Sequence, residues 1–371
     1  MQPLRWLTSL LRTQQQPPPK TESFYGLDHA VLNLPIPPPS MWMNLGYWKD
    51  TTDFPTACAA LLDQVLITAG LLDSDDGGGG GGPLPHPANK SFRMLDVGIG
   101  CGDQALRILG YKREMPMGGG GGDGGGNGLR PLFDEYVGIT SLPVQAEFAA
   151  RRVAKLQEEA DEKSSAQAAK TRAGIFCADA AKPASWSKDI HASLEPFRTK
   201  PHQEHATDPE KENQELESEE QPESLTETYF LALDTLYHFS PSRVPLLKYT
   251  KTTLNANFLA FDLLLPRTPL PLITRLLLRL LCLITGTPYS NFLTESEYIS
   301  LLVEAGYDES QIEIRDISEH VFSGIARFMK RRVAEAKMFG VGGAGKYKAS
   351  AVVFNWWATG VVRGVVVVAR V

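Results

Sequence analysis

One carboxylate and three glycines at alternate positions form the clearest ligand-binding pattern in the chain: Asp96, Gly98, Gly100 and Gly102. They follow the apolar run 92–97 and precede the helix-compatible segment 103–110, which predicts a strand, a glycine turn and a helix. Glycines adopt positive φ and let a ligand approach the backbone closely. The N-terminus of the following helix favours negative charge. We therefore expect a nucleotide-like ligand here; the alternative is a tight turn without a ligand.

The residue after the third glycine narrows the class of ligand. A dinucleotide-binding turn reads G-x-G-x-x-G, and its last glycine packs the helix on the strand; here that position is Asp103. The order D-x-G-x-G-x-G instead resembles the first motif of the class I S-adenosylmethionine-dependent methyltransferases. This resemblance implies S-adenosyl-L-methionine as the cofactor, bound by Asp96 and the three glycines, with Asp96 beside the cationic amino end.

The second predicted strand, 135–139, is followed by a threonine where most nucleotide-binding sheets place an acid for the ribose hydroxyls. The stretch GITSLPVQ, residues 138–145, is similar to the group of tocopherol, cyclopropane-fatty-acid and mycolic-acid methyltransferases. The similarity implies that Thr140 and Gln145 hold the ribose of the cofactor. An ordinary strand end followed by a helix cap is the alternative.

A carboxylate also follows the third predicted strand, 174–178, at Asp179. In the resembling families an aspartate here commonly accepts a hydrogen bond from the exocyclic amine of adenine. Asp179 could equally be an N-cap for the following turn, and the two roles are compatible. Trp186 either covers the adenine or belongs to the core.

The fourth predicted strand, 229–234, ends in Asp234, and His238 stands four residues further on. In the small-molecule methyltransferases that this motif resembles, the loop lies beside the methyl group. Imidazole titrates near neutral pH, so His238 is the candidate catalytic base for an acceptor hydroxyl or amine. The alternative is a structural histidine.

An aromatic pair, Tyr47 and Trp48, lies in the segment 41–49 before the first predicted helix. The sequence NLGYW resembles the N-terminal lid of the same group, which implies that the pair covers the cofactor. Aromatic faces attract a sulfonium cation by the physics of cation–π contacts. A hydrophobic plug at the edge of the sheet is the alternative.

Composition limits the class of protein. The chain has 371 residues, a net charge of −6 and 43% hydrophobic residues, which is enough for a substantial core. Its mild acidity argues against a nucleic-acid partner. The four cysteines lack zinc-site spacing and read as reduced thiols, so we expect no metal site and a cytoplasmic protein. Residues 1–20 are basic and loosely fit a mitochondrial transit peptide, although we prefer a disordered tail.

Strands and helices alternate once low-complexity segments are set aside. Residues 1–40 are interpreted as a tail, and 41–371 as one methyltransferase domain with loop insertions at 74–88, 117–130 and 199–227. Strands are predicted at 92–97, 135–139, 174–178, 229–234, 256–263 and 363–369, and helices at 56–72, 103–110, 142–160, 242–252 and 294–305. This alternation predicts a doubly wound α/β fold with ligands at the carboxyl ends of a mostly parallel sheet. The resemblance adds that the Rossmann-like sheet has seven strands, the last antiparallel.

Residues 263–286 are rich in leucine but contain prolines and arginines, which exclude a simple membrane-spanning helix. The resemblance implies a helical, acceptor-binding cap near here, at 263–300. Arg275 and Arg279 share one helical face, which suits a cap over an apolar pocket or a helix that contacts a membrane surface. A core helix is the third interpretation.

The resemblance extends over residues 41–330, insertions excluded. It implies methyl transfer from S-adenosylmethionine to a small, lipophilic acceptor. Two other classes stay open, a catalytically inactive S-adenosylmethionine-binding scaffold and a nicotinamide-dependent oxidoreductase. Asp103 and Thr140 argue against the second. The acceptor, the atom that is methylated and the oligomeric state do not follow from these residues.

Overall fold

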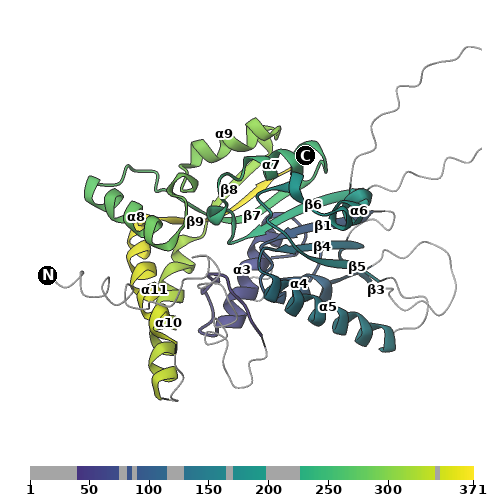
Figure 1. The fold of residues 1–371 in the computed structure, drawn as a ribbon, viewed down its shortest axis with the longest axis horizontal. Coiled ribbons are helices and arrows are strands. Elements are labelled where there is room, and N and C mark those ends of the chain that lie inside the picture. Colours follow the sequence, from purple (N-terminus) through teal and green to yellow (C-terminus); the bar gives the residue numbers. More distant parts are fainter. Residues whose placement is uncertain are drawn as a thin grey trace, which may run out of the picture.

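One central sheet organises the protein in the computed structural model, which describes residues 40–74, 82–85, 90–114, 129–163, 170–197, 226–338 and 343–371. Its strands are β1 (Ser91–Val97), β4 (Glu135–Thr140), β5 (Arg172–Cys177), β6 (Thr226–Leu233), β7 (Asn257–Leu264), β8 (Ile312–Asp316) and β9 (Arg363–Ala369). Their order across the sheet is β5-β4-β1-β6-β7-β9-β8. Figure 1 shows helices on both sides of this sheet, as predicted for a doubly wound fold.

The directions of the strands confirm the predicted sheet. β5, β4, β1, β6 and β7 pair in parallel, and β9 lies antiparallel to both β7 and β8. The edge strand β8 is an addition to the predicted set, because Ile312 and Ile314 alone give too short an apolar alternation. A separate antiparallel ribbon of β2 (Lys112–Glu114) and β3 (Leu129–Pro131) flanks the insertion predicted at 117–130.

The helices pack against the sheet in two groups. They are α3 (Phe54–Thr68), α4 (Asp103–Gly110), α5 (Pro143–Lys163), α6 (Lys188–Leu194), α7 (Val244–Thr252), α8 (Leu272–Thr285), α9 (Glu295–Ala305), α10 (Phe322–Met338) and α11 (Gly345–Trp356). One core cluster joins the sheet to α3, α4, α10 and α11, and a second joins it to α6, α7 and α9. The helices α6, α10 and α11 are additions to the predicted set, and α8 lies inside the predicted cap.

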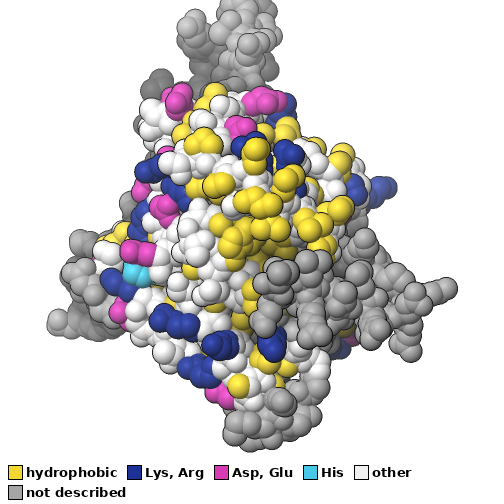
Figure 2. Space-filling model, turned by 90° about the vertical axis from the view of Figure 1, so that its left-hand side faces the viewer, with side chains coloured by type: hydrophobic (Ala, Val, Ile, Leu, Met, Phe, Trp, Pro, Cys, Tyr) yellow, Lys and Arg dark blue, Asp and Glu magenta, His cyan; other side chains and the backbone are white. Residues whose placement is uncertain are grey.

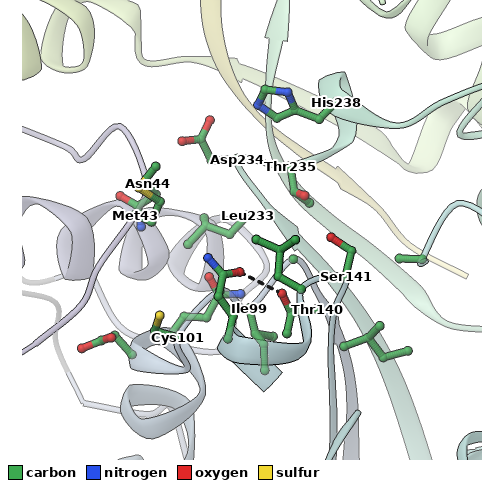
Figure 3. A pocket seen from close by; sticks show the side chains of 18 of the residues that line it. Met43, Asn44, Ile99, Cys101, Thr140, Ser141, Leu233, Asp234, Thr235 and His238 are labelled. Atoms are coloured by element: carbon green, nitrogen blue, oxygen red, sulfur yellow. Dashed lines mark hydrogen bonds between the residues drawn. The ribbon is translucent and has the colours of Figure 1, made fainter. Parts of the chain in front are cut away.

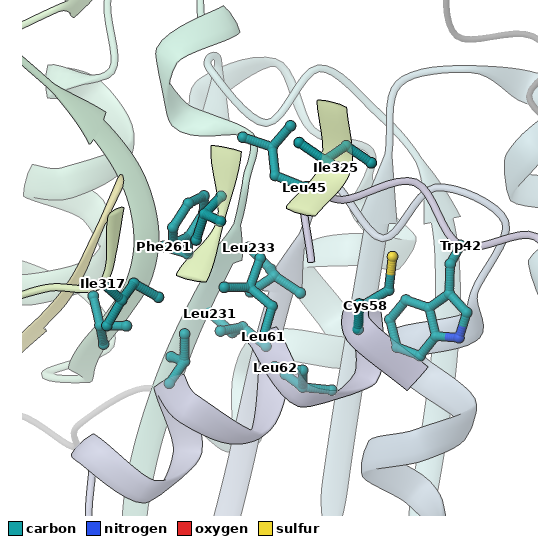
Figure 4. Packing of buried hydrophobic residues seen from close by; sticks show 14 of the residues in the cluster. Trp42, Leu45, Cys58, Leu61, Leu62, Leu231, Leu233, Phe261, Ile317 and Ile325 are labelled. Atoms are coloured by element: carbon teal, nitrogen blue, oxygen red, sulfur yellow. The ribbon is translucent and has the colours of Figure 1, made fainter. Parts of the chain in front are cut away.

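The central strands are buried on both faces. In β6, Leu231 and Leu233 pack in the first core cluster, whereas Phe230 packs in the second. Figure 4 shows the first cluster, where Leu61 and Leu62 of α3 lie beside the β6 leucines. Burying one such side chain contributes about 1.5–3 kcal/mol. This packing fixes the carboxyl end of β6, where a pocket lies.

The predicted tail, 1–40, and the three predicted insertions fall mostly on residues outside those that the structure describes. Among the described helices, none combines the length and the apolar character that crossing a membrane requires.

Candidate functional site

A pocket of about 380 Å³ lies at the carboxyl ends of β1, β4, β5 and β6 (Figure 3). Ligands of open α/β sheets bind at this edge. Six of the residues predicted for the site line the pocket: Gly98, Gly100, Thr140, Gln145, Asp179 and His238. The other four do not line it: Tyr47, Trp48, Asp96 and Gly102. The fold therefore brings most of the predicted site together from four separate strand ends.

The three glycines of the turn are required for different reasons. All have positive φ, +78° at Gly98, +54° at Gly100 and +89° at Gly102. A Cβ on Gly98 would lie 2.5 Å from Oγ1 of Thr235, and one on Gly102 would lie 2.8 Å from Cβ of Ala149. A Cβ on Gly100 would meet nothing within 4 Å. Close packing thus requires glycine at positions 98 and 102, whereas Gly100 leaves its backbone open to the pocket.

Asp96 lies behind the glycine turn, fully buried. Its Oδ1 accepts a hydrogen bond from Nε2 of Gln104 at 2.7 Å, and its Oδ2 accepts one from the hydroxyl of Tyr136 at 2.6 Å. Because both oxygens are engaged and Gln104 itself lines the pocket, the geometry does not support the expected direct contact between Asp96 and a cationic ligand end. Asp96 instead orients Gln104.

Burial raises the pKa of Asp96 to about 7, against the hydrogen bonds from Tyr136 and Gln104, which lower it. Asp96→Asn is therefore expected to flatten the pH dependence of stability. The wild-type carboxyl stabilises the fold fully below its ordinary pKa of 3.8, and this contribution is lost as pH rises to about 7, at up to about 1.4 kcal/mol per pH unit. Asparagine cannot ionise. Urea unfolding across this pH range checks the prediction, and equal slopes for both proteins would contradict it.

The ends of β4 and β5 contribute a polar wall. Thr140 and Gln145 are both buried, and Oγ1 of Thr140 donates to Oε1 of Gln145 at 3.2 Å (dashed line in Figure 3). Asp179 lines the pocket and accepts from the backbone N–H of Ala181 at 3.0 Å, so it also caps the following turn. Trp186 is buried in the second core cluster and is not part of the pocket lining, which favours its core role.

Two carboxylates hold the N-terminal segment across the pocket. Oδ2 of Asp103 accepts from the backbone N–H of Met41 at 3.0 Å, and Arg152 pairs with Asp103 at 2.6 Å. Oδ2 of Asp234 accepts from the backbone N–H of Leu45 at 2.9 Å. Because Asp103 follows β1 and Asp234 follows β6, the segment is anchored at two strand ends. The residues between these anchors, 41–44, line the pocket.

The aromatic pair predicted to cover the cofactor lies elsewhere. The indole of Trp48 is buried against the rings of Phe54 and Phe328, and its Nε1 donates to the carbonyl of Leu45 at 2.7 Å. Tyr47 packs on the ring of His320 at 5.0 Å between centroids. The positions fit the hydrophobic plug rather than the cover, and residues 41–44 take the place of the lid.

His238 and Asp234 face the same end of the pocket (Figure 3). Burial lowers the pKa of His238 to about 4 and raises the pKa of Asp234 to about 8, where hydrogen bonds from Tyr237 and Leu45 oppose the rise. Near neutral pH the imidazole is therefore unprotonated and the carboxyl is largely protonated. Nδ1 of His238 lies 3.4 Å from Oγ1 of Thr287. This end of the pocket carries a proton acceptor without a formal charge.

Among the pocket-lining residues outside the set predicted for the site, Asp103, Gln104 and Asp234 have the clearest roles in the hydrogen-bond network. Asp234 had a sequence signal, because a carboxylate directly after a buried strand lies at the ligand-binding edge. Its φ of +58° is rare for a residue other than glycine and is not visible in the sequence. The anchoring role of Asp103 depends on Met41, which lies 62 positions away.

The strand order, the antiparallel β9 and the glycine turn after β1 together define the class I methyltransferase fold. No protein-family model matches the chain, and no curated protein matches its sequence. Solved structures do match. The [4+2]-cyclase SpnF has 16% identity and a TM-score of 0.52, with 96% of this chain and 98% of that chain covered.

Two further structures have the same fold. The cyclopropane synthase MmaA2 from Mycobacterium tuberculosis has 13% identity and a TM-score of 0.52, with 96% of this chain and all of that chain covered (100%). The mycolic acid cyclopropane synthase CmaA1, complexed with SAH and CTAB, has 12% identity and a TM-score of 0.51, with coverage of 96% and 100%. At such identities the likeness establishes the fold, and the residues of the pocket carry the argument about function.

Proposed function

We propose that the protein transfers a methyl group from S-adenosyl-L-methionine to a small, lipophilic acceptor. The observation that carries the proposal is the convergence of the glycine turn, the Thr140–Gln145 pair and Asp179 on one pocket beneath the segment 41–44. Its volume, about 380 Å³, lies in the range of roughly 300–1,000 Å³ that is typical of cofactor and ligand sites. The CmaA1 structure is a complex with SAH, which supports the same cofactor class.

Each part of the pocket suits one part of the cofactor. The open backbone at Gly100 and the side chain of Gln104 suit the amino-acid end, and Asp96 acts through Gln104. Thr140 and Gln145 suit the ribose hydroxyls, and Asp179 suits the exocyclic amine of adenine. The segment 41–44 excludes water from the reacting centre. Alignment of the reactants in such a site can lower the activation barrier by roughly 7–11 kcal/mol.

The bound cofactor supplies a methyl group on a sulfonium, which is already a good leaving group. His238 accepts the proton that an acceptor hydroxyl or amine loses as its lone pair forms the new bond to carbon. The imidazole is neutral before transfer, and as an imidazolium it then carries the positive charge that the sulfonium loses. Asp234 holds the lid through Leu45 and, when ionised, stabilises positive charge nearby.

Two alternatives have weaker support. In a dinucleotide-binding turn the position of Asp103 is a glycine, whereas Asp103 here is paired with Arg152 and bound to Met41; this disfavours a nicotinamide-dependent oxidoreductase. A scaffold without catalysis would leave His238 without a task in the pocket. SpnF, which has the same fold, is a [4+2]-cyclase, so the proposal of methyl transfer rests on the residues of the pocket.

Calorimetric titration with S-adenosylmethionine, with nicotinamide adenine dinucleotide as control, tests the proposed cofactor. We expect binding of the first ligand only, and Gly98→Ala should weaken it at least about tenfold. The added methyl group meets Thr235, which costs the native turn about 1–3 kcal/mol, and the positive φ costs it about 1–2 kcal/mol more. The turn therefore shifts away from the conformation that binds the ligand. Gly110→Ala is the matched control, since its Cβ would meet nothing within 4 Å. Binding of the nicotinamide cofactor alone would overturn the proposal.

A further inference from the structure

The helix α8 carries the largest run of exposed aliphatic side chains in the part of the chain that the structure describes. Seven of its residues have between 39% and 74% of their surface exposed: Leu272, Ile273, Leu276, Leu277, Leu280, Leu283 and Ile284. At 100° per residue they fill a continuous arc of about 140°. Only Leu278 and Cys282 of this helix are buried in the core. The outer face of α8 therefore costs free energy in water and indicates a contact surface.

Charge around this arc limits what can cover it. Arg275 and Arg279 lie along one edge of the arc, where Arg279 stacks over the ring of Tyr289 at 4.9 Å and Arg275 donates to the carbonyl of Leu270 at 3.4 Å. The sequence contains no Asp or Glu between Asp262 and Glu295, although the whole chain has a net charge of −6. Figure 2 shows hydrophobic side chains gathered on this face with Lys or Arg side chains beside them. The segment 263–294, which carries this face, is thus rich in apolar residues, cationic and free of acids.

We propose that α8 lies on an anionic lipid bilayer, with its aliphatic arc in the acyl region and Arg275 and Arg279 at the phosphates. A helix with such a face and flanking cations is the kind that lies in the plane of a membrane interface, and arginine stems cover apolar surface while their charges reach water. Anionic headgroups complement both arginines. This inference goes beyond the proposed function and holds whether or not methyl transfer occurs.

The C-terminal end of α8 connects this membrane face to the pocket. Oγ1 of Thr285, the last residue of α8, donates to Oγ1 of Thr287 at 3.1 Å, and Thr287 lies 3.4 Å from Nδ1 of His238. The 3₁₀ turn that follows, Tyr289–Asn291, supports the same loop, because Nδ2 of Asn291 donates to the carbonyl of Phe239 at 2.7 Å. The His238 end of the pocket therefore lies next to the face that contacts lipid.

Flotation of the full chain with vesicles tests the proposal. We expect co-flotation with an equal mixture of phosphatidylcholine and phosphatidylglycerol, and much less with phosphatidylcholine alone. Leu276→Glu with Leu283→Glu should lower binding at least about tenfold, since two insertions worth about 1.5–3 kcal/mol each are lost. Each of Arg275→Gln and Arg279→Gln should lower binding to anionic vesicles about fivefold.

Leu129→Glu is the matched control, because Leu129 is 61% exposed on β3, far from α8 in Figure 1. It should float as the wild type does. Retained binding of S-adenosylmethionine shows that the α8 variants are folded. If the wild type floats but does not bind S-adenosylmethionine, the membrane proposal stands and the proposed function fails. Absence of flotation would overturn the proposal. Unchanged flotation of the α8 double variant would also overturn it, because another segment such as residues 4–11 would then bind the vesicles. A dimer in solution that Leu276→Glu dissociates would overturn it as well, because a second copy of the chain would then cover α8.

Discussion

His238→Ala is expected to lower the rate of methyl transfer by about 10²–10⁴-fold, the usual contribution of a positioned base, without weakening the binding of S-adenosylmethionine. The imidazole lines the end of the pocket proposed for the acceptor, whereas the residues proposed for the ribose and adenine follow β4 and β5. Transfer of a labelled methyl group to a lipid extract measures the rate, and calorimetry measures binding. A drop in both quantities would indicate a structural role for His238 instead.

The pH profile separates a base from a structural residue. The pKa of His238 is lowered to about 4, so the rate of the wild type should fall only as pH drops through this value, where the imidazole becomes protonated. In His238→Ala this acid limb should disappear. His320→Ala is the matched control, because His320 packs on Tyr47 outside the pocket lining, and it should keep both rate and profile. Full activity of His238→Ala would remove the assigned role.

The ionisation of Asp234 adds a second, alkaline feature. Its pKa is raised to about 8, so the carboxylate forms as pH rises through this value. A negative charge beside the pocket favours a cationic ligand, and cofactor affinity should accordingly increase across the same pH range. Calorimetric titration with S-adenosylmethionine over this pH range measures the affinity. An increase near pH 8 would assign the alkaline transition to Asp234, as the acid limb of the rate assigns the other transition to His238.

The sheet could be predicted because its strands are long, apolar and bounded by turn signals. The run Val365 to Val368 is buried on both faces of β9, and such β-branched runs are typical of central strands. The edge strand β8 lacks this signal, since none of its five residues is fully buried and two are exposed. The helices α10 and α11 lie between β8 and β9 in the sequence and pack on each other. Strand–helix alternation does not predict this helical pair.

The pocket could be predicted as a set of strand ends, but the direction of each side chain could not. Asp96 is at the expected position, yet Tyr136, forty positions away, occupies one of its oxygens. The lid is another case. It has no helical or strand periodicity that would fix its register, and residues 41–44 line the pocket where Tyr47 and Trp48 were expected. Its register depends on anchors at Asp103 and Asp234, which only the fold brings near.

Arg243→Ala is expected to cost about 3–5 kcal/mol of unfolding free energy, the usual effect of removing one partner of a buried ion pair. Nη1 of Arg243 lies 2.5 Å from Oδ2 of Asp262, with 2% and 0% of the two side chains exposed. Nη2 donates to the carbonyl of Asn291 at 2.6 Å, and the amide of Asn291 holds the backbone of Phe239. The loop that carries His238 should therefore loosen, and turnover should fall along with stability.

The sign of the pH dependence and two controls make the Arg243→Ala prediction specific. Burial raises the pKa of Asp262, and the Arg243 guanidinium opposes this rise. Without Arg243 the folded carboxyl holds its proton to a higher pH. The stability deficit of Arg243→Ala should then be smallest at acid pH, where Asp262 is protonated in the wild type and in the variant, and should grow as pH rises.

Arg151→Ala removes an exposed pair with Glu147 and should cost at most about 1 kcal/mol. Arg243→Met with Asp262→Leu should recover much of the loss, because no unpaired charge stays buried. A deficit in urea unfolding that is independent of pH, or equal to that of Arg151→Ala, would show that this buried pair does not support the His238 loop.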